Sequence, residues 1–357
     1  MIQNESFTLS LLTVFLFISF FITFFVQKYF SKKKNILLDA DFLKPQSFHT
    51  TATARCGGLA AIFSLSVFFI IYYLFFEKIL LDYILVSFSL FFVGFIDDIK
   101  IQVNPNIRLF LMINLLILCI AFLGINLESI DLKFLDTMLM PYQENKIFHI
   151  LFVLLCFLFI VNGANLIDGF NGLVGMHLLI INIILLYLNL ENTENDFLFI
   201  LTIQIIILFC FLIFNFPKAL IFLGDGGSYL FGGLTVLNII KTNNINPGIS
   251  SFFFCILLFY LFFEVFFSFF RKIYLKKSPL KPDENHLHML SYRWLRSIGK
   301  FNNCNYLNSL FINFVYFLLI IPGLYYNNNG IFCRYWFFSL LAFYLIFYSR
   351  LYSFVKK

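Results

Sequence analysis

Long apolar stretches dominate the chain, and short polar segments separate them. A helix of about 20 apolar residues crosses the hydrocarbon core of a bilayer, so such stretches predict membrane spans. The first stretch follows no basic residue, which does not fit a cleaved signal peptide. The pattern predicts an all-α, polytopic integral membrane protein of about eleven spans: Thr8–Val26, Gly57–Phe76, Leu80–Ile96, Ile107–Gly124, Ile147–Val161, Gly172–Leu190, Phe197–Phe214, Ser228–Ile240, Ile249–Phe270, Leu307–Leu324 and Gly330–Tyr348.

The eighth of these stretches is too short to cross a membrane, since a crossing needs roughly 20 residues. We expect its helix to continue past Ile240, with Lys241 reaching toward the membrane surface. Without a crossing here, the sidedness of every later segment would be inverted.

The basic residues indicate the orientation of the spans. Of the 25 Lys and Arg residues, 20 lie after odd-numbered spans and only 5 lie on the other side. Basic loops stay in the cytoplasm, so the N-terminus is predicted outside and the C-terminus in the cytosol. The whole chain, 1–357, is predicted to be one membrane-embedded domain. Its cytosolic segments lie near residues 44–56, 97–107, 162–172, 215–228 and 271–306.

Composition excludes several classes of protein. The seven Cys are scattered singly without a Cys-x-x-Cys pair, which argues against a disulfide framework or a zinc site. Only 12% of residues are charged, and no soluble domain is visible. Membrane lipids are therefore expected as surroundings, and no nucleic acid is expected as a partner.

The segment Val161–Gly175 carries an unusual polar cluster between two apolar spans. Turn chemistry explains its glycines but not Asn162, Asn165 and Asp168 together. Their spacing of three residues keeps them near one side of a helical continuation. Polar groups beside hydrocarbon must be satisfied or functional, so these three are candidate site residues.

Asp97 and Asp98 end the third predicted span on the cytosolic side. A helix C-terminus carries partial negative charge, so adjacent carboxylates there need a compensating cation. Lys100 could supply it, and so could a divalent metal. The alternative is an ordinary charged helix end.

Two further polar motifs lie on the same predicted face. In the first, Asn215 precedes Phe222-Leu-Gly224-Asp225-Gly-Gly-Ser, whose glycine amides could cradle a phosphate at a helix N-terminus. The second is the His-x-His motif of the basic loop, His286 and His288, and Arg293 is expected to bind phosphate beside it. His-x-His also resembles half a metal site, but no third His or Cys accompanies it.

The motifs therefore bring four carboxylates to one face, without matching positive charge in their own motifs: Asp97, Asp98, Asp168 and Asp225. Such a site would repel a phosphate unless a divalent ion neutralised it. Mg²⁺ prefers carboxylate and amide oxygens, so Mg²⁺ is the predicted cofactor, with Mn²⁺ as an alternative. A nucleotide substrate and a membrane acceptor would satisfy the whole set.

Taken in order, these motifs resemble the polyprenyl-phosphate N-acetylhexosamine-1-phosphate transferases, the MraY/WecA-type enzymes of glycosyltransferase family 4. The resemblance runs from Arg55-Cys-Gly-Gly to His288. Ala54 stands where family members often have Pro, and Leu287 and Met289 interrupt the three consecutive His of the peptidoglycan branch. The chain therefore looks closer to the WecA branch.

The resemblance implies Mg-dependent transfer of a sugar 1-phosphate, such as that of GlcNAc, from a UDP-N-acetylhexosamine to polyprenyl (undecaprenyl) phosphate, with release of UMP. It implies an inner-membrane enzyme with a cytosolic active site, which initiates O-antigen or other envelope polysaccharide synthesis and can form a homodimer. One-step and two-step mechanisms both stay open. Alternatives are phospho-MurNAc-pentapeptide transfer and, in another class, transport of a nucleotide sugar or anion.

The resemblance also assigns a role to each candidate residue. The predicted catalytic residues are Asp97, Asp98 and Asp168. The predicted metal ligands are Asn165 and Asp225. The predicted substrate-binding residues are Asn162, Asn215, Phe222, Gly224, His286, His288 and Arg293.

Overall fold

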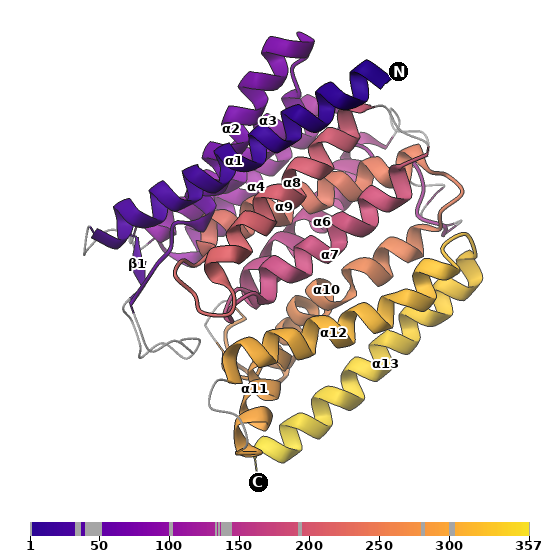
Figure 1. Ribbon diagram of the computed structural model, residues 1–357. Coiled ribbons are helices and arrows are strands. Elements are labelled where there is room, and N and C mark those ends of the chain that lie inside the picture. The colour runs from indigo at the N-terminus through magenta and orange to yellow at the C-terminus, as the bar shows by residue number, and fades with distance from the viewer. Residues whose placement is uncertain are drawn as a thin grey trace.

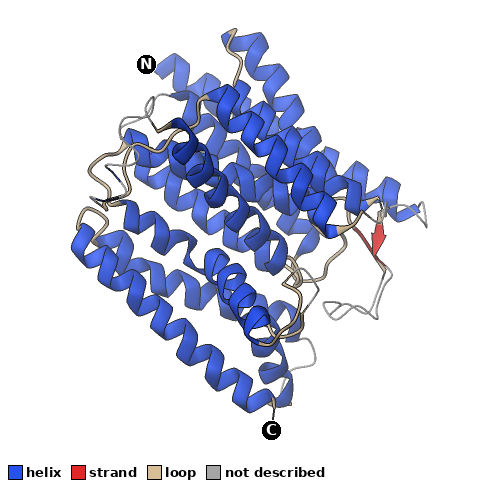
Figure 2. Cartoon of the chain, turned by 180° about the vertical axis from the view of Figure 1, so that it is seen from behind, coloured by secondary structure: helices blue, strands red, loops and turns tan. Residues whose placement is uncertain are grey.

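The computed structural model shows a bundle of long helices with one short β hairpin at its edge (Figures 1 and 2). It describes residues 2–32, 37–39, 52–99, 103–132, 134, 136, 145–191, 195–279, 283–299 and 304–356. Of the predicted cytosolic segments, residues 44–51, 100–102, 280–282 and 300–303 lie outside this description. The helices are α1 (Ile2–Lys32), α2 (Gly57–Phe76), α3 (Leu81–Asp98), α4 (Pro105–Leu123), α6 (Lys146–Ile167), α7 (Leu173–Asn189), α8 (Asn195–Asn215), α9 (Gly224–Ile245), α10 (Ser251–Tyr274), α11 (Leu287–Ser297), α12 (Cys304–Tyr325) and α13 (Gly330–Val355).

Each of the eleven predicted spans corresponds to one of these helices. Within the described residues, α2, α4, α6, α8, α12 and α13 are long and apolar enough to cross a membrane, and α10 is a seventh if its two halves count as one span. The halves of α10, Ser251–Leu257 and Phe259–Tyr274, meet at an angle of 72°. The protein is therefore an all-α, multi-pass membrane protein, while the number of eleven crossings stays a prediction.

The eighth predicted span is longer in the structure than its apolar core suggested. Helix α9 has 22 residues, which corresponds to about 33 Å at the usual rise per residue. It extends beyond the predicted Ser228–Ile240 at both ends, although it is not among the helices that are apolar enough to count as candidate spans. The two chain ends lie at opposite ends of the bundle, which an odd number of crossings requires (Figure 1). The orientation in the membrane stays a prediction.

The predicted cytosolic segments are more helical than expected. The segment 271–306 was interpreted as a basic loop, but α10 continues to Tyr274 and the amphipathic helix α11 occupies its centre. Leu287, Leu290 and Trp294 recur at helical spacing in α11, and Leu287 and Leu290 are buried. The two arginines of this helix, Arg293 and Arg296, had instead favoured its interpretation as part of a basic loop. Helix α6 likewise continues through the polar segment to Ile167.

Local sequence explains where several helices begin. Asn104 precedes α4, and its side chain accepts a hydrogen bond from the amide of Asn106, while Pro105 takes the first helical position. Ser250 caps α10 in the same way through the amide of Phe252. The chain thus satisfies amides that a helix start leaves without partners.

Helix α9 forms the centre of the bundle and packs against α2, α3, α6 and α7. Nearly all of its side chains are buried, in contrast to the lipid-facing helices. Asn238 in α9 donates to Asn182 of α7 at 3.2 Å and to Gln204 of α8 at 2.8 Å. Tyr83 of α3 donates to the same Asn238 at 3.0 Å. These buried amides satisfy one another inside the bundle and tie four helices together.

Helices α3 and α9 approach each other at a glycine. A Cβ atom added to Gly94 would lie 2.3 Å from the carbonyl oxygen of Asp225, so any side chain there must push the two backbones apart. A Cβ atom added to Gly58 of α2 would likewise lie 2.3 Å from the amide nitrogen of Gly227. Both contacts fix the start of α9.

We therefore expect Gly94→Ala to destabilise the protein by about 1–3 kcal/mol, as overpacking usually does. The displacement of Asp225 should also lower the protein's activity. Gly248→Ala is a matched control, because no atom lies within 4 Å of its added Cβ. Thermal unfolding in detergent should separate the two variants, and equal stability would contradict this packing.

Candidate functional site

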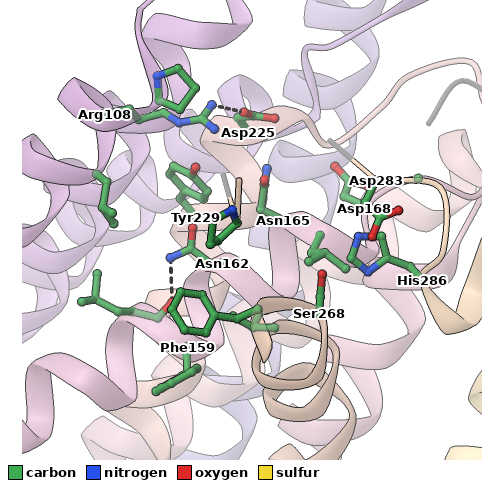
Figure 3. A pocket seen from close by; sticks show the side chains of 18 of the residues that line it. Arg108, Phe159, Asn162, Asn165, Asp168, Asp225, Tyr229, Ser268, Asp283 and His286 are labelled. Carbon is green, nitrogen blue, oxygen red and sulfur yellow. Dashed lines mark hydrogen bonds and ion pairs between the residues drawn. The ribbon is translucent and has the colours of Figure 1, made fainter. Parts of the chain in front are cut away.

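A cavity of about 710 Å³ opens between α3, α4, α6, α9 and α10 and the segment before α11 (Figure 3). It collects most of the residues that the sequence singled out, although they come from distant parts of the chain. The predicted site residues that line it are Asp97, Asn162, Asn165, Asp168, Phe222, Gly224, Asp225 and His286. Asp98, Asn215, His288 and Arg293 are not among its lining residues.

The end of α6 presents its polar side chains to this cavity. Because the helix continues to Ile167, Asn162 and Asn165 lie one turn apart on one face. The Asn165 amide donates to the hydroxyl of Ser228 at 3.1 Å, and this hydroxyl donates to the carbonyl of Asp225 at 3.2 Å. Asn165 is thereby held beside the first turn of α9.

The loop before α9 is fixed by backbone pairing with the start of α2. Strands β1 (Leu38–Asp39) and β2 (Thr53–Ala54) form an antiparallel hairpin, and Ala54 also bridges to the segment at Ile221. The amide of Phe222 donates to the carbonyl of Ala54 at 2.8 Å, and the amide of Gly57 donates to the carbonyl of Phe222 at 2.9 Å. This pairing explains why two motifs far apart in sequence lie together.

Asp98 holds the first amides of α9. Its carboxylate accepts hydrogen bonds from the amide of Asp225 at 3.0 Å and from that of Gly226 at 2.8 Å. A carboxylate at a helix N-terminus is stabilised by the helix dipole and by the free amides. The sequence predicted that amides of this glycine-rich turn would cradle a phosphate. Two of the amides at the helix start instead bind Asp98, because α3 and α9 approach so closely.

Two arginines neutralise part of the acidic cluster. Nη1 of Arg108 lies 2.7 Å from Oδ2 of Asp97 and 2.8 Å from Oδ2 of Asp225. Arg55 donates from Nε and Nη2 to Oδ2 of Asp39, at 3.0 and 2.7 Å, and its Nη1 lies 3.9 Å from Asp98. Burial disfavours the charge of Arg55, yet the neighbouring carboxylates raise its pKa above the ordinary value.

Sequence reasoning missed these two cations as site residues. Arg108 was counted only toward the orientation of the spans, and Arg55 only as part of a motif. A signal for Arg108 exists in the sequence, since it is the sole basic residue of the predicted fourth span and lies in that span's first turn.

Asp168 lies at the end of α6, just outside the helix, and lines the same cavity. Burial, and after it the negative charge of Asp225, raises the pKa of Asp168 to about 7. A cation that entered the cavity would oppose both effects and favour the charged carboxylate. The site is thus poorer in positive charge than its carboxylates need.

The two histidines of the His-x-His motif have different surroundings. His286 lines the cavity, and its Nδ1 lies 3.0 Å from Oε2 of the buried Glu264, whose Oε1 accepts the amide of Leu287 at 3.1 Å. His288 is buried, and its Nε2 has no hydrogen-bond partner among the described residues. Burial lowers the pKa of His288 to about 3, so it is neutral. Spacing alone could not tell these environments apart.

Glu264 pairs with His286 and not with Arg271. Arg271 instead forms an ion pair with Asp283 and donates to the hydroxyl of Tyr348 at 2.5 Å. Burial alone would raise the pKa of Asp283, yet this guanidinium holds the pKa below its ordinary value. The basic segment is therefore braced by its own ion pair.

Asn215 and Arg293 lie outside the cavity wall. Asn215 is buried, accepts the amide of Gly172 at 2.5 Å, and donates to the carbonyl of Ile221 at 2.7 Å. It therefore joins the ends of two polar motifs. Arg293 forms an ion pair with Glu284 at 2.6 Å. Their predicted substrate-binding roles stay predictions.

The donor set suits a hard divalent cation, although the site is not a complete protein cage. Within the described residues, no three His, Cys, Asp or Glu side chains are placed to hold a metal ion together. Mg²⁺ does not require such a cage, since it is usually held by one or two carboxylates, water and substrate phosphates. Asp225 and Asn165 offer a carboxylate and an amide oxygen at the cavity wall, so the residues fit this ion.

Comparison with known proteins agrees with this chemistry. Residues 80–243 match the family model described as glycosyl transferase family 4. An undecaprenyl-phosphate alpha-N-acetylglucosaminyl 1-phosphate transferase of Thermotoga maritima is 28% identical over 285 residues, which is 79% of this chain and 80% of that protein. Phospho-N-acetylmuramoyl-pentapeptide-transferases of Orientia tsutsugamushi and Helicobacter pylori are 28% and 29% identical, over 65% and 64% of this chain and 72% of each relative. Together with the helical architecture, these matches support the polyprenyl-phosphate hexosamine-1-phosphate transferase family for this chain.

Proposed function

We propose that the protein transfers an N-acetylhexosamine 1-phosphate, such as GlcNAc 1-phosphate, from a UDP-sugar to undecaprenyl phosphate, with Mg²⁺ as cofactor. The observation that carries this proposal is one cavity with two kinds of wall. Carboxylates, amides and guanidiniums form one part of it, and a second part is apolar. Much of the apolar part comes from α6 and α10, which contribute Leu155, Leu158, Phe159, Phe266, Phe269 and Phe270.

Such a cavity can hold a polar nucleotide and a lipid chain with their phosphates together. In the reaction, an oxygen of the lipid phosphate forms a bond to the phosphorus that carries the sugar. The bond from this phosphorus to UMP breaks, and UMP leaves with the electron pair. A divalent cation would neutralise charge on the phosphates during this exchange. The chain's own residues position and neutralise the reactants.

Asp225 and Asn165 would hold the cation, while Arg55 and Arg108 supply positive charge for the phosphates. His286, oriented by Glu264 through Nδ1, faces the cavity, and its protonated form can donate from Nε2 to a phosphate. A phosphomonoester loses its second proton near pH ~6, so the lipid phosphate is already mostly a dianion at neutral pH. Proton removal is therefore the smaller part of the task of Asp97 and Asp98.

The test is transfer by the purified protein, with a panel of labelled UDP-N-acetylhexosamines and undecaprenyl phosphate, with and without Mg²⁺. We expect a lipid-linked diphosphate sugar and an equal amount of UMP, both dependent on the metal. Uptake of an intact nucleotide sugar into vesicles, without a lipid product, would instead support a transporter.

A second candidate is transfer of phospho-N-acetylmuramoyl-pentapeptide, because two of the relatives carry this name. The interrupted His motif favours the UDP-N-acetylhexosamine over the muramoyl-pentapeptide, since Leu287 and Met289 are buried apolar residues beside His288. Adding the UDP-linked muramoyl-pentapeptide to the same panel distinguishes the two. Formation of the pentapeptide lipid alone would favour the second candidate.

A further inference from the structure

Arg108 takes an unusual position among the acidic residues of the cavity. A single nitrogen, Nη1, lies 2.7 Å from a carboxylate oxygen of Asp97 and 2.8 Å from one of Asp225. Asp97 comes from α3, Asp225 from α9 and the arginine from the first turn of α4. Figure 3 shows Arg108 beside Asp225. One positive group thus lies at the point where carboxylates of two helices meet.

Bridging two carboxylates at one point is also what a divalent cation does. Asp225 is the carboxylate that would hold the metal, and it offers its Oδ2 to Arg108 here. Two cations at the same oxygens repel each other strongly in a partly buried site. Binding of the metal at Asp225 and pairing with Arg108 should therefore exclude each other.

The side chain of Arg108 has room to move away from the two carboxylates. Its side chain is 23% exposed and lines the cavity. Its guanidinium carbon lies 5.8 Å from the ring centre of Tyr229, a contact that keeps it near the cavity wall. A guanidinium that faces a phosphate site forms bidentate hydrogen bonds to the phosphate oxygens.

We propose that Arg108 occupies the place of the divalent cation in the metal-free protein and moves to the substrate phosphates when the metal binds. This inference rests on the proposed function, whose site it shares. It gives Arg108 two successive roles as a positioning residue. Without the metal, Arg108 holds the carboxylates of Asp97 and Asp225 together. Once the metal binds these carboxylates, Arg108 binds the substrate phosphates.

The exchange couples the two ligands. A metal that displaces Arg108 frees a phosphate donor, and a phosphate that draws Arg108 away frees the metal ligands. By linkage, each ligand then raises the affinity for the other by the same factor. The metal should therefore bind more tightly when a UDP-sugar is present.

The test measures Mn²⁺ binding to the purified full-length protein without substrate, by electron paramagnetic resonance, for wild type and Arg108→Gln. Loss of the competing charge should strengthen Mn²⁺ binding about tenfold, which corresponds to about 1.4 kcal/mol for one charge-assisted contact. The same variant should transfer sugar phosphate more slowly. Opposite changes in metal affinity and in rate are the result that a purely structural role would not produce.

Two further variants guard the interpretation. Arg108→Lys keeps a cation beside the carboxylates, so its Mn²⁺ affinity should stay close to that of wild type. Arg350→Gln changes an exposed arginine of α13 and should change neither quantity. Thermal unfolding confirms that each variant is folded.

The inference is overturned if Arg108→Gln binds Mn²⁺ as weakly as wild type or more weakly, or if neither protein binds it. Because binding is measured without substrate, that result is separate from the transfer assay. A protein that transfers sugar phosphate while Arg108→Gln shows no gain in metal affinity would keep the proposed function and lose this inference.

Discussion

Asp225→Asn is expected to reduce sugar-phosphate transfer at least about 100-fold, because it removes the negative charge from the proposed metal ligand. The amide has nearly the same shape, so the packing against Gly94 should be kept. The variant should also require much more Mg²⁺ to reach its highest rate. Initial rates of lipid-product formation over a range of Mg²⁺ concentrations measure both effects.

A matched control is Asp196→Asn, which also neutralises an ion-paired aspartate. Asp196 pairs with Lys78 at 2.6 Å. Lys78 follows the C-terminal end of α2, which is the end away from the cavity. We expect this variant to transfer at nearly the wild-type rate. If Asp225→Asn kept the wild-type rate and Mg²⁺ dependence, the assignment of Asp225 as a metal ligand would be wrong.

Much of the fold could be predicted because lipid imposes a simple rule. Every apolar stretch long enough to cross a membrane must hydrogen-bond its own backbone, and helices are the simplest way to do so. Each predicted span is accordingly a helix in the structure. The polar motifs could be found for the same reason, since clusters such as Asn162, Asn165 and Asp168 are rare beside hydrocarbon.

The pairing of the site residues could not be predicted, because it depends on how helices approach in three dimensions. Asp98 and Asp97 are adjacent in sequence, yet one caps α9 and the other faces Arg108 in the cavity. The close contact of α3 and α9 at Gly94 determines that Asp98 is the residue that caps α9. His286 and His288 were likewise treated alike, although only His286 lines the cavity. Helix α11 was missed because its two arginines favoured its interpretation as part of a basic loop.

Asp98→Asn is expected to lower the transfer rate about 100-fold, and raising the pH to about 9 should not restore it. Both carboxylate oxygens of Asp98 accept backbone amides, those of Asp225 and Gly226. An asparagine offers one acceptor and turns an NH₂ group toward the other amide. The start of α9 should then shift, and Asp225 with it.

The pH dependence separates this positioning role from that of a general base. If Asp98 removed a proton from the acceptor, higher pH would supply the deprotonated phosphate and rescue the variant. The acceptor is mostly a dianion already at neutral pH, since its second pKa is near ~6, so little remains to be rescued. Rates from about pH 6 to 9, together with Mn²⁺ affinity, measure the difference. Full recovery at high pH with unchanged metal binding would show that Asp98 acts on the proton, whereas weakened metal binding without recovery would show that it acts through Asp225.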